Sequence, residues 1–428
     1  MLIFAREPIF DIKQRLFAYQ LVFRDSISGE LPLAQGDVSQ IACNPESTYP
    51  QVVEHAKVET FKDSSTAIIL DDLLQGFVSL ISVSRAAIES DILDQLSIED
   101  TILELSDDSI DESYLGEAIS ILKSKGFRIA LLNQHDLRDE HYRAIDFLKV
   151  DVNHISLLEF KQLQAHTENY KCKIIASKIE NHEQFEKCVN AGFDFFQGHF
   201  FLARQHTQHE DLPANKLSLL RLLAQTADSS INMEAIRETF EHDATLSYLL
   251  MRFINNPMVN KSHQITSIKH ALTYLGEVML RKFVAIISIA QLNQDKVQEL
   301  LQVSLVRAKY CELLDMQLGK EKQAMTAFMT GLFSLIDVIL DRDMAHLLAQ
   351  IPVSPLIKQA LLKQEGEYHD LLSSVKALES SNWLKFKALA KTLGLSQEQL
   401  HQHYLEAVQW NNSMMTATSD MFPRAKAS

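Results

Sequence analysis

The sequence predicts an α/β barrel of the TIM-like (β/α)8 kind followed by an all-α domain. Three observations lead to this prediction. At 428 residues the chain is too long for one ordinary core, so two or three domains are expected. Up to about residue 203, short apolar runs alternate with stretches of helical spacing. Beyond that point the apolar residues recur with the helical period alone.

The first half contains short apolar runs of strand length. In chain order they are LIFAR (2–6), LFAYQLVF (16–23), TAIIL (66–70), FVSLIS (77–82), TILEL (101–105), FRIALL (127–132), FLKVDV (147–152), KIIAS (173–177) and FDFFQGHFF (193–201). Segments with helical spacing, such as 109–125 and 181–191, lie between them. This alternation implies a parallel sheet, and at this length a closed barrel is expected. Residues 9–14 are few enough for a hairpin turn, so the first strand is expected to be antiparallel.

The polar stretch 203–216, ARQHTQHEDLPANK, marks the boundary between the two halves. Helices are predicted beyond it over residues 217–227, 244–255, 267–276, 277–292 and 323–340, with Pro257 and Gly276 as breaks. The predicted division is a barrel over 1–204, a linker over 205–215, a helical domain over 216–415 and a loose tail over 416–428.

Composition excludes several classes of function. A net charge of -15 argues against nucleic-acid binding, which needs a surplus of lysine and arginine. None of the four cysteines forms a C-x-x-C pair, so zinc and redox motifs have no support. Arg6 and Glu7 leave no apolar signal segment, and the longest apolar run, 283–290, is too short for a membrane span. A cytoplasmic protein without a membrane segment is expected.

Several phrases, taken in order, resemble a bacterial two-domain signalling family. In the first half they are FAREPIFD, FAYQLVFR, ILELSDD, FLKVDV, SKIENHEQFE and FFQGHFF, which resemble the EAL domain. In the second half they are DATLSYLLMRFINNP, SIKHALTYLGEVMLRKFV and AFMTGLFSLIDVIL, which resemble the HDOD domain. The resemblance implies a barrel that hydrolyses cyclic di-GMP in active members, joined to an all-helical relative of metal-dependent HD phosphohydrolases.

Active EAL domains resemble two-metal hydrolases, whose hard cations need carboxylate ligands at the strand tips. The resemblance places five family ligands on residues that have lost the ligand chemistry: Gln20, Ser79, Leu132, Asn133 and Ser177. It retains five others: Glu104, Lys149, Asp151, Glu180 and Gln197. Arg24 matches an arginine near the ligand phosphate, so Arg24 and Gln197 are the candidate residues for binding the nucleotide.

The balance of charge predicts that no metal pair binds. Two divalent cations bring about four positive charges, and only Glu104 and Asp151 remain as carboxylates that would bind them directly. Lys149 adds a positive charge at the same place. No catalytic residue and no cofactor is therefore expected, and Mg²⁺ or Mn²⁺ would enter only with residual phosphodiesterase activity. In the structural alternative, Glu104 and Lys149 simply form an ion pair.

The helical half is expected to lack metal ligands as well. The positions of the HD pair fall on Ser334 and Leu335, neither of which binds a divalent cation, and Asp337 remains alone. The dipeptide His242–Asp243 opens a helix, where Asp243 is well placed as an N-cap. A helical domain without an active site is most simply a protein-binding module.

Three functions follow from these expectations. The leading one is a non-catalytic signalling protein linked to cyclic di-GMP, whose HDOD domain docks a sensor kinase, a diguanylate cyclase or a regulator. The second is a receptor that binds cyclic di-GMP without hydrolysis, and the third is a phosphodiesterase with an atypical metal site. Because EAL-like barrels often pair, a homodimer would fit each of them.

Overall fold

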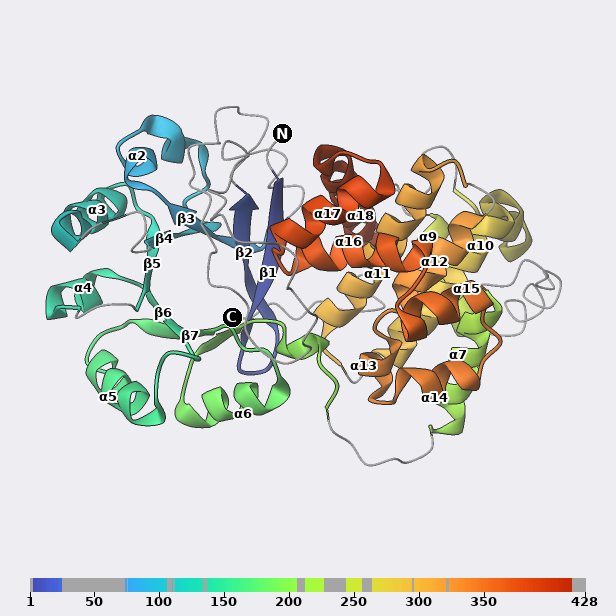
Figure 1. Ribbon diagram of the computed structural model, residues 1–428, viewed down its shortest axis with the longest axis horizontal. Coiled ribbons are helices and arrows are strands. Elements are labelled where there is room, and N and C mark those ends of the chain that lie inside the picture. The colour runs from blue at the N-terminus through green and yellow to red at the C-terminus, as the bar shows by residue number, and fades with distance from the viewer. Residues whose placement is uncertain are drawn as a thin grey trace, which may run out of the picture.

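The computed structural model describes residues 3–24, 74, 76–105, 110, 112–133, 137–205, 212–226, 244–255, 264–294, 296–320 and 323–417. A closed barrel lies beside a helical half, so both parts of the predicted fold class are confirmed (Figure 1). Some predicted features lie outside the described residues: the strand over 66–70, the linker residues 206–211, the pair His242–Asp243 and the tail residues 418–428.

The barrel closes in the order β1 to β8. Its strands are β1 Ile3–Asp11, β2 Leu16–Arg24, β3 Val78–Val83, β4 Thr101–Leu105, β5 Arg128–Leu132, β6 Phe147–Asp151, β7 Lys173–Ser177 and β8 Phe195–Gln197. β1 runs antiparallel to both of its neighbours, β2 and β8, and all other neighbouring strands are parallel. The antiparallel orientation predicted for the first strand is therefore confirmed.

The last strand is shorter than the sequence predicted. β8 ends at Gln197, and a 3₁₀ turn, η4 (Phe200–Leu202), replaces the rest of the predicted strand over 193–201. The reason is Gly198, which has a φ of +145° and lies against the backbone of Ile179. A Cβ at this glycine would lie 2.1 Å from the Ile179 carbonyl oxygen, so only glycine lets the chain turn here.

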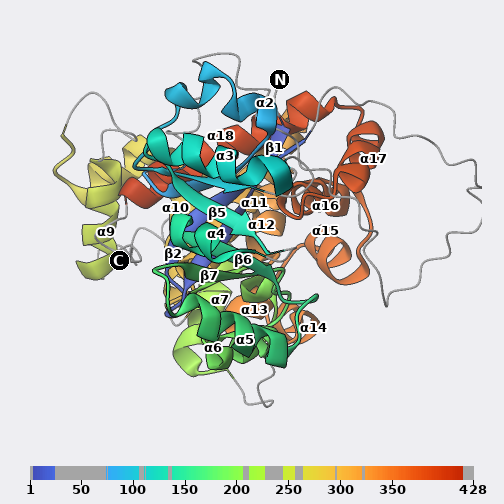
Figure 2. The ribbon, with the colours of Figure 1, turned by 90° about the vertical axis from the view of Figure 1, so that its left-hand side faces the viewer.

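Helices cover the outer side of the barrel from β3 to β8 (Figure 2). They are α2 Arg85–Ile88, η3 Asp91–Gln95, α3 Glu112–Ser124, α4 Asp139–Ala144, α5 Leu157–Thr167 and α6 His182–Ala191. The barrel interior holds an apolar layer made by one inward-facing side chain from each of seven strands: Ile9, Ala18, Leu80, Ile102, Ala130, Phe147 and Ile175. The inward residues two positions further toward the carboxyl ends are polar on β2, β3, β4, β6 and β7, whereas β5 has Leu132 there.

The second half is helical throughout its described residues. Its elements are α7 Ala214–Gln225, α9 Ala244–Ile254, α10 Ile268–Leu292, α11 Gln298–Gln317, α12 Ala324–Phe333, α13 Ile336–Leu340, α14 Met344–Ala349, α15 Pro355–Lys358, η6 Gln359–Lys363, α16 Glu367–Glu379, α17 Trp383–Leu393 and α18 Gln397–Ala417. Gly276 kinks α10 with a φ of +67°, which confirms the predicted break between two helical segments.

The prediction of a single helix over 323–340 is wrong. α12 ends at Phe333 and α13 begins at Ile336, because Leu335 leaves the helical conformation with φ -128° and ψ 12°. Apolar spacing continues through the break, so periodicity alone does not reveal it. The Ser334 hydroxyl at this break accepts a hydrogen bond from Arg307 Nη1 at 3.3 Å.

Helices of the second half, rather than a barrel helix, cover the outer face of β1. Both α16 and α18 pack against this strand (Figure 1). One apolar cluster consequently continues from the barrel wall into the helices, and it includes Phe4 and Phe23 on one side and Tyr310, Leu371 and Val408 on the other. The two halves therefore share an apolar core, and packing contacts hold them together in addition to the linker.

Candidate functional site at the barrel mouth

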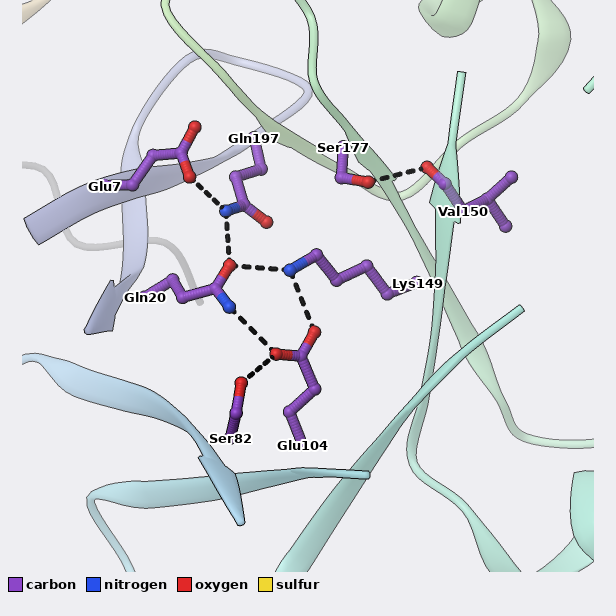
Figure 3. Close-up of polar contacts among 8 residues, drawn as sticks. All are labelled: Glu7, Gln20, Ser82, Glu104, Lys149, Val150, Ser177 and Gln197. Carbon is purple, nitrogen blue, oxygen red and sulfur yellow. Dashed lines mark hydrogen bonds and ion pairs between the residues drawn. The ribbon is translucent and has the colours of Figure 1, made fainter. Parts of the chain in front are cut away.

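A buried polar network fills the mouth of the barrel (Figure 3). We call it the mouth network, and its members are Glu7, Gln20, Ser82, Glu104, Lys149 and Gln197. Each comes from a different strand and points inward, directly above the apolar layer. The alternation of side chains along a strand explains this order, since Gln20, Ser82 and Glu104 each lie two residues beyond an apolar-layer residue.

Lys149 and Glu104 form the centre of the mouth network. Lys149 Nζ lies 2.8 Å from Glu104 Oε1 and donates to Gln20 Oε1 at 2.6 Å. The other oxygen of Glu104 accepts from Gln20 Nε2 at 2.8 Å and from the Ser82 hydroxyl at 2.6 Å. Glu104 is 1% exposed and Lys149 is 7% exposed, so water contributes little to their solvation. The ion pair expected in the structural alternative is thus present.

Gln197 extends the mouth network to the first strand. Its Nε2 donates to Gln20 Oε1 and, at 2.6 Å, to Glu7 Oε2. Its own Oε1 is buried and has no hydrogen-bond partner among the described residues. The resemblance named Gln197 and Gln20, whereas Glu7 and Ser82 were not among the predicted site residues.

Ser79 does not join this site. It lies at the amino end of β3, where its hydroxyl donates to the Asp100 carbonyl oxygen at 3.2 Å. Ser82, three residues later, is the β3 residue in register with Glu104 and in contact with its carboxylate. Counting the inward-facing residues of the strand from Leu80 would have identified Ser82, because inward positions recur every second residue.

Asp151 contacts residues of the loops after β6 and β7 rather than the mouth network. Its carboxylate pairs with Lys178 at 2.8 Å and with His154 at 2.9 Å, and it accepts a hydrogen bond from the Asn153 backbone amide. Partial burial raises the pKa of this carboxyl, but the hydrogen bonds from Lys178, Asn153 and His154 outweigh burial and the pKa is lowered. Asp151 is therefore an ionised carboxylate whose charge is already compensated.

The remaining predicted positions contribute no charge to the mouth network. Ser177 donates to the Val150 carbonyl oxygen at 3.0 Å, Glu180 is exposed, and Leu132 and Asn133 are half-buried at the end of β5. Arg24 is the last residue of β2, and its side chain lies outside the described part of the structure.

The residues at the mouth do not fit a pair of divalent cations. Both oxygens of Glu104 already accept hydrogen bonds, and the Lys149 ammonium occupies the position between Glu104 and Gln20. Over the described ranges, no group of three or more His, Cys, Asp and Glu side chains is placed to hold a metal ion. The chemistry that this arrangement can perform without a metal is hydrogen bonding and charge pairing.

The residues at the HD-pair positions of the helical half, Ser334 and Leu335, have structural contacts instead. Ser334 accepts from Arg307, and Leu335 is buried in the apolar core of the helices. Burial raises the pKa of the Asp337 carboxyl, which lies 3.8 Å from the Arg204 guanidinium. Arg204 in turn lies 3.6 Å from Asp343, so the end of the barrel chain is tied to the helices by charge.

Comparison with known proteins agrees with this architecture. Residues 212–351 match the HDOD domain family. YuxH of Bacillus subtilis, described as uncharacterised, is 27% identical over 426 residues, which cover 96% of this chain and 98% of the relative. The cyclic di-GMP phosphodiesterase CdgJ of Vibrio cholerae is 25% identical over 422 residues, covering 96% and 92%.

Solved EAL structures resemble the barrel half. An EAL domain protein from Listeria monocytogenes has 18% sequence identity and a TM-score of 0.33, covering 47% of this chain and 87% of its own. A standalone EAL protein from Vibrio cholerae, solved with cyclic di-GMP, has 16% identity and a TM-score of 0.33, covering 50% and 94%.

No helix among the described residues is both long enough and apolar enough to cross a membrane. The closed barrel with its antiparallel first strand, the HDOD match and the two relatives of nearly full length all lead to the same architecture. The chain therefore joins a closed, EAL-like barrel to a helical half that matches the HDOD domain family over residues 212–351.

Proposed function

We propose that this is a non-catalytic, cytoplasmic signalling protein linked to cyclic di-GMP. Its EAL barrel is a pseudoenzyme, and its HDOD domain binds a signalling protein such as a sensor kinase, a diguanylate cyclase or a regulator. The observation that supports the proposal is the contact of Lys149 Nζ with Glu104, 2.8 Å apart and buried. An acid paired in this way is not available to hold a catalytic cation.

Opening the mouth network to admit a metal would be energetically unfavourable. To release Glu104 for a metal, Lys149 would have to leave its two acceptors while still surrounded by protein. Breaking a buried ion pair typically costs about 3–5 kcal/mol. A second cation would then need carboxylates that Gln20, Ser82 and Ser177 do not provide.

The name of CdgJ supports the opposite conclusion, because that relative is a phosphodiesterase at 25% identity. A direct assay decides between the two. Purified full-length protein is incubated with cyclic di-GMP and Mg²⁺ or Mn²⁺, with an active EAL phosphodiesterase as the positive control. We expect no linear dinucleotide. Enzyme-like turnover that is lost in Glu104→Ala would overturn the proposal, and turnover unaffected by Glu104→Ala would indicate a contaminant.

Partner binding is best tested with the full-length chain, because the two halves share a core. Tagged protein is used to recover partners from the native cell, and each recovered protein is then purified and titrated directly. We expect at least one signalling protein to bind with a defined stoichiometry. Light scattering of the purified chain measures whether a homodimer forms.

One observation favours a second candidate, a receptor that binds cyclic di-GMP without cutting it. Gln197 is 2% exposed, and its Oε1 lacks a hydrogen-bond partner among the described residues. A guanine N–H could satisfy such an acceptor at the mouth. Calorimetry with cyclic di-GMP tests this candidate, and absence of heat up to about 100 μM, where any useful affinity would show, excludes it.

A further inference from the structure

A cavity separate from the barrel mouth lies between the two halves of the molecule. Its volume is about 660 Å³, within the range of small-molecule sites. The barrel contributes the turn between β1 and β2 together with η4, and the helical half contributes the segment between α10 and α11. Boundaries between domains are a preferred location for ligand sites.

Three cationic side chains line the cavity in a protein that is acidic overall. Lys13, Arg15 and Lys296 line it, against Glu299 as the acid among the described lining residues. Asp11 holds Arg15 at 2.6 Å and Asp341 pairs with Lys296, so both cations are fixed in position rather than extended into solvent. Lys13 is exposed on the turn. This arrangement is suited to an anionic group such as a phosphate.

A buried acceptor lies beside these cations. Asn293 lines the cavity, is 5% exposed, and donates through Nδ2 to the Val297 carbonyl oxygen at 3.2 Å. Its Oδ1 is buried and has no hydrogen-bond partner among the described residues. Leaving such an oxygen unsatisfied is costly, and a donor N–H from a ligand would satisfy it.

The rest of the lining mixes apolar side chains with polar ones such as Gln205 and Gln298. Phe10 and Phe201 from the barrel and Leu301 from α11 form its apolar part, and all three side chains belong to the buried cores. A ligand with an anionic group, a ring that carries an N–H donor and apolar ring faces matches the cations, the buried acceptor and this apolar part. We propose that this cavity binds a purine nucleoside monophosphate.

Calorimetry with the full-length chain tests the proposal. The probes are AMP and GMP, with ribose 5-phosphate and inorganic phosphate as probes that lack the base. We expect AMP or GMP to bind once per chain, at least about tenfold more tightly than ribose 5-phosphate, a difference of 1.4 kcal/mol. No heat from either nucleotide up to about 1 mM overturns the proposal.

Two matched charge reversals locate the site. Lys13→Glu changes an exposed residue on the cavity rim, and Lys161→Glu makes the same change on the exposed face of α5, away from the cavity. Lys13→Glu should weaken nucleotide binding about tenfold, whereas Lys161→Glu should leave it unchanged. Equal affinities in the two variants would place the nucleotide elsewhere and overturn the assignment.

Asn293→Ala tests the role of the buried acceptor. We expect it to reduce the preference for AMP or GMP over ribose 5-phosphate, because the ring loses its acceptor while the phosphate keeps its cations. Thermal melting of each variant without ligand shows that it folds. A folded Asn293→Ala variant with the full preference would contradict the proposed orientation of the base.

Discussion

Tyr19 of the barrel donates its hydroxyl to Glu299 of the helical half, 2.9 Å from each carboxylate oxygen. The two side chains are 2% and 4% exposed, and the guanidinium of Arg6 lies 4.9 Å from the centre of the Tyr19 ring. The next residue of β2, Gln20, points into the barrel and belongs to the mouth network. Consecutive residues of one strand thus contact the mouth and the helical half.

Tyr19→Phe should destabilise the protein by about 1.5–3 kcal/mol, because Glu299 stays buried after losing a charge-assisted hydrogen bond. Tyr274→Phe is the control, since Tyr274 is 48% exposed on α10 and the same atom is removed there. Urea unfolding of the two variants measures the difference. If their midpoints agree, the contact contributes nothing to stability.

Lys149→Met should lower the free energy of unfolding by about 3–5 kcal/mol, because it leaves the Glu104 carboxylate buried without its cation. At an exposed site, Lys187→Met removes the partner of Glu183 from a pair whose side chains are 71% and 78% exposed. The loss of stability there should be much smaller, because water and salt screen an exposed ion pair. Urea unfolding at neutral pH measures the loss of stability in both variants. Similar losses in Lys149→Met and Lys187→Met would show that the Lys149–Glu104 pair is not desolvated.

Stability should fall between about pH 6.5 and pH 4 because of His401. Burial lowers the pKa of this histidine to about 4, and its Nε2 lies 3.2 Å from the Phe4 backbone nitrogen. In this window the unfolded chain binds a proton that the folded chain does not. The lost stability is on the order of 3 kcal/mol and is complete below about pH 4.

His401→Gln should flatten this part of the pH profile, whereas His270→Gln, at an exposed position on α10, should leave its slope intact. Thermal melting across the pH range provides the measurement. A profile for His401→Gln with the wild-type slope would assign the titration to another group.

Gly331→Ala should destabilise the helical half by several kcal/mol. A Cβ at this position of α12 would lie 2.4 Å from the Arg307 carbonyl oxygen on α11, a backbone atom that cannot move alone. Gly116→Ala on α3 is the control, since nothing lies within 4 Å of its Cβ position. There the substitution should stabilise the protein by about 0.5–1 kcal/mol. Equal effects at the two positions would contradict the close packing of α11 and α12.

The sequence predicted the fold class well because both periodicities are local. The antiparallel β1 followed from a short turn, and the break at Gly276 followed from one glycine. The end of β8 was missed because the close approach of Gly198 to Ile179 depends on tertiary contact and leaves no mark in the apolar pattern. The break between α12 and α13 at Leu335 was missed for a similar reason, because Leu335 is apolar and fits the helical spacing of its apolar neighbours.

The site was predicted in part. Glu104, Lys149, Gln20 and Gln197 come together at the mouth, as strand-end residues should. Asp151 was expected beside them, but its carboxylate is instead bonded to Asn153 and His154, which are close to it in sequence, and to Lys178, which follows β7. The contacts between the halves lay beyond sequence reasoning. Tyr19 and Glu299 are 280 residues apart, and Phe4 and His401 are 397 apart, with no local pattern linking them.

The position of β1 has a consequence for biosynthesis. This strand is made long before the helices that shield its outer face, α16 and α18. Until then a nascent chain exposes the apolar side of its first strand, a surface open to chaperones and to aggregation. Ribosomes that stall before residue 367 would therefore release a barrel whose β1 lacks both covering helices.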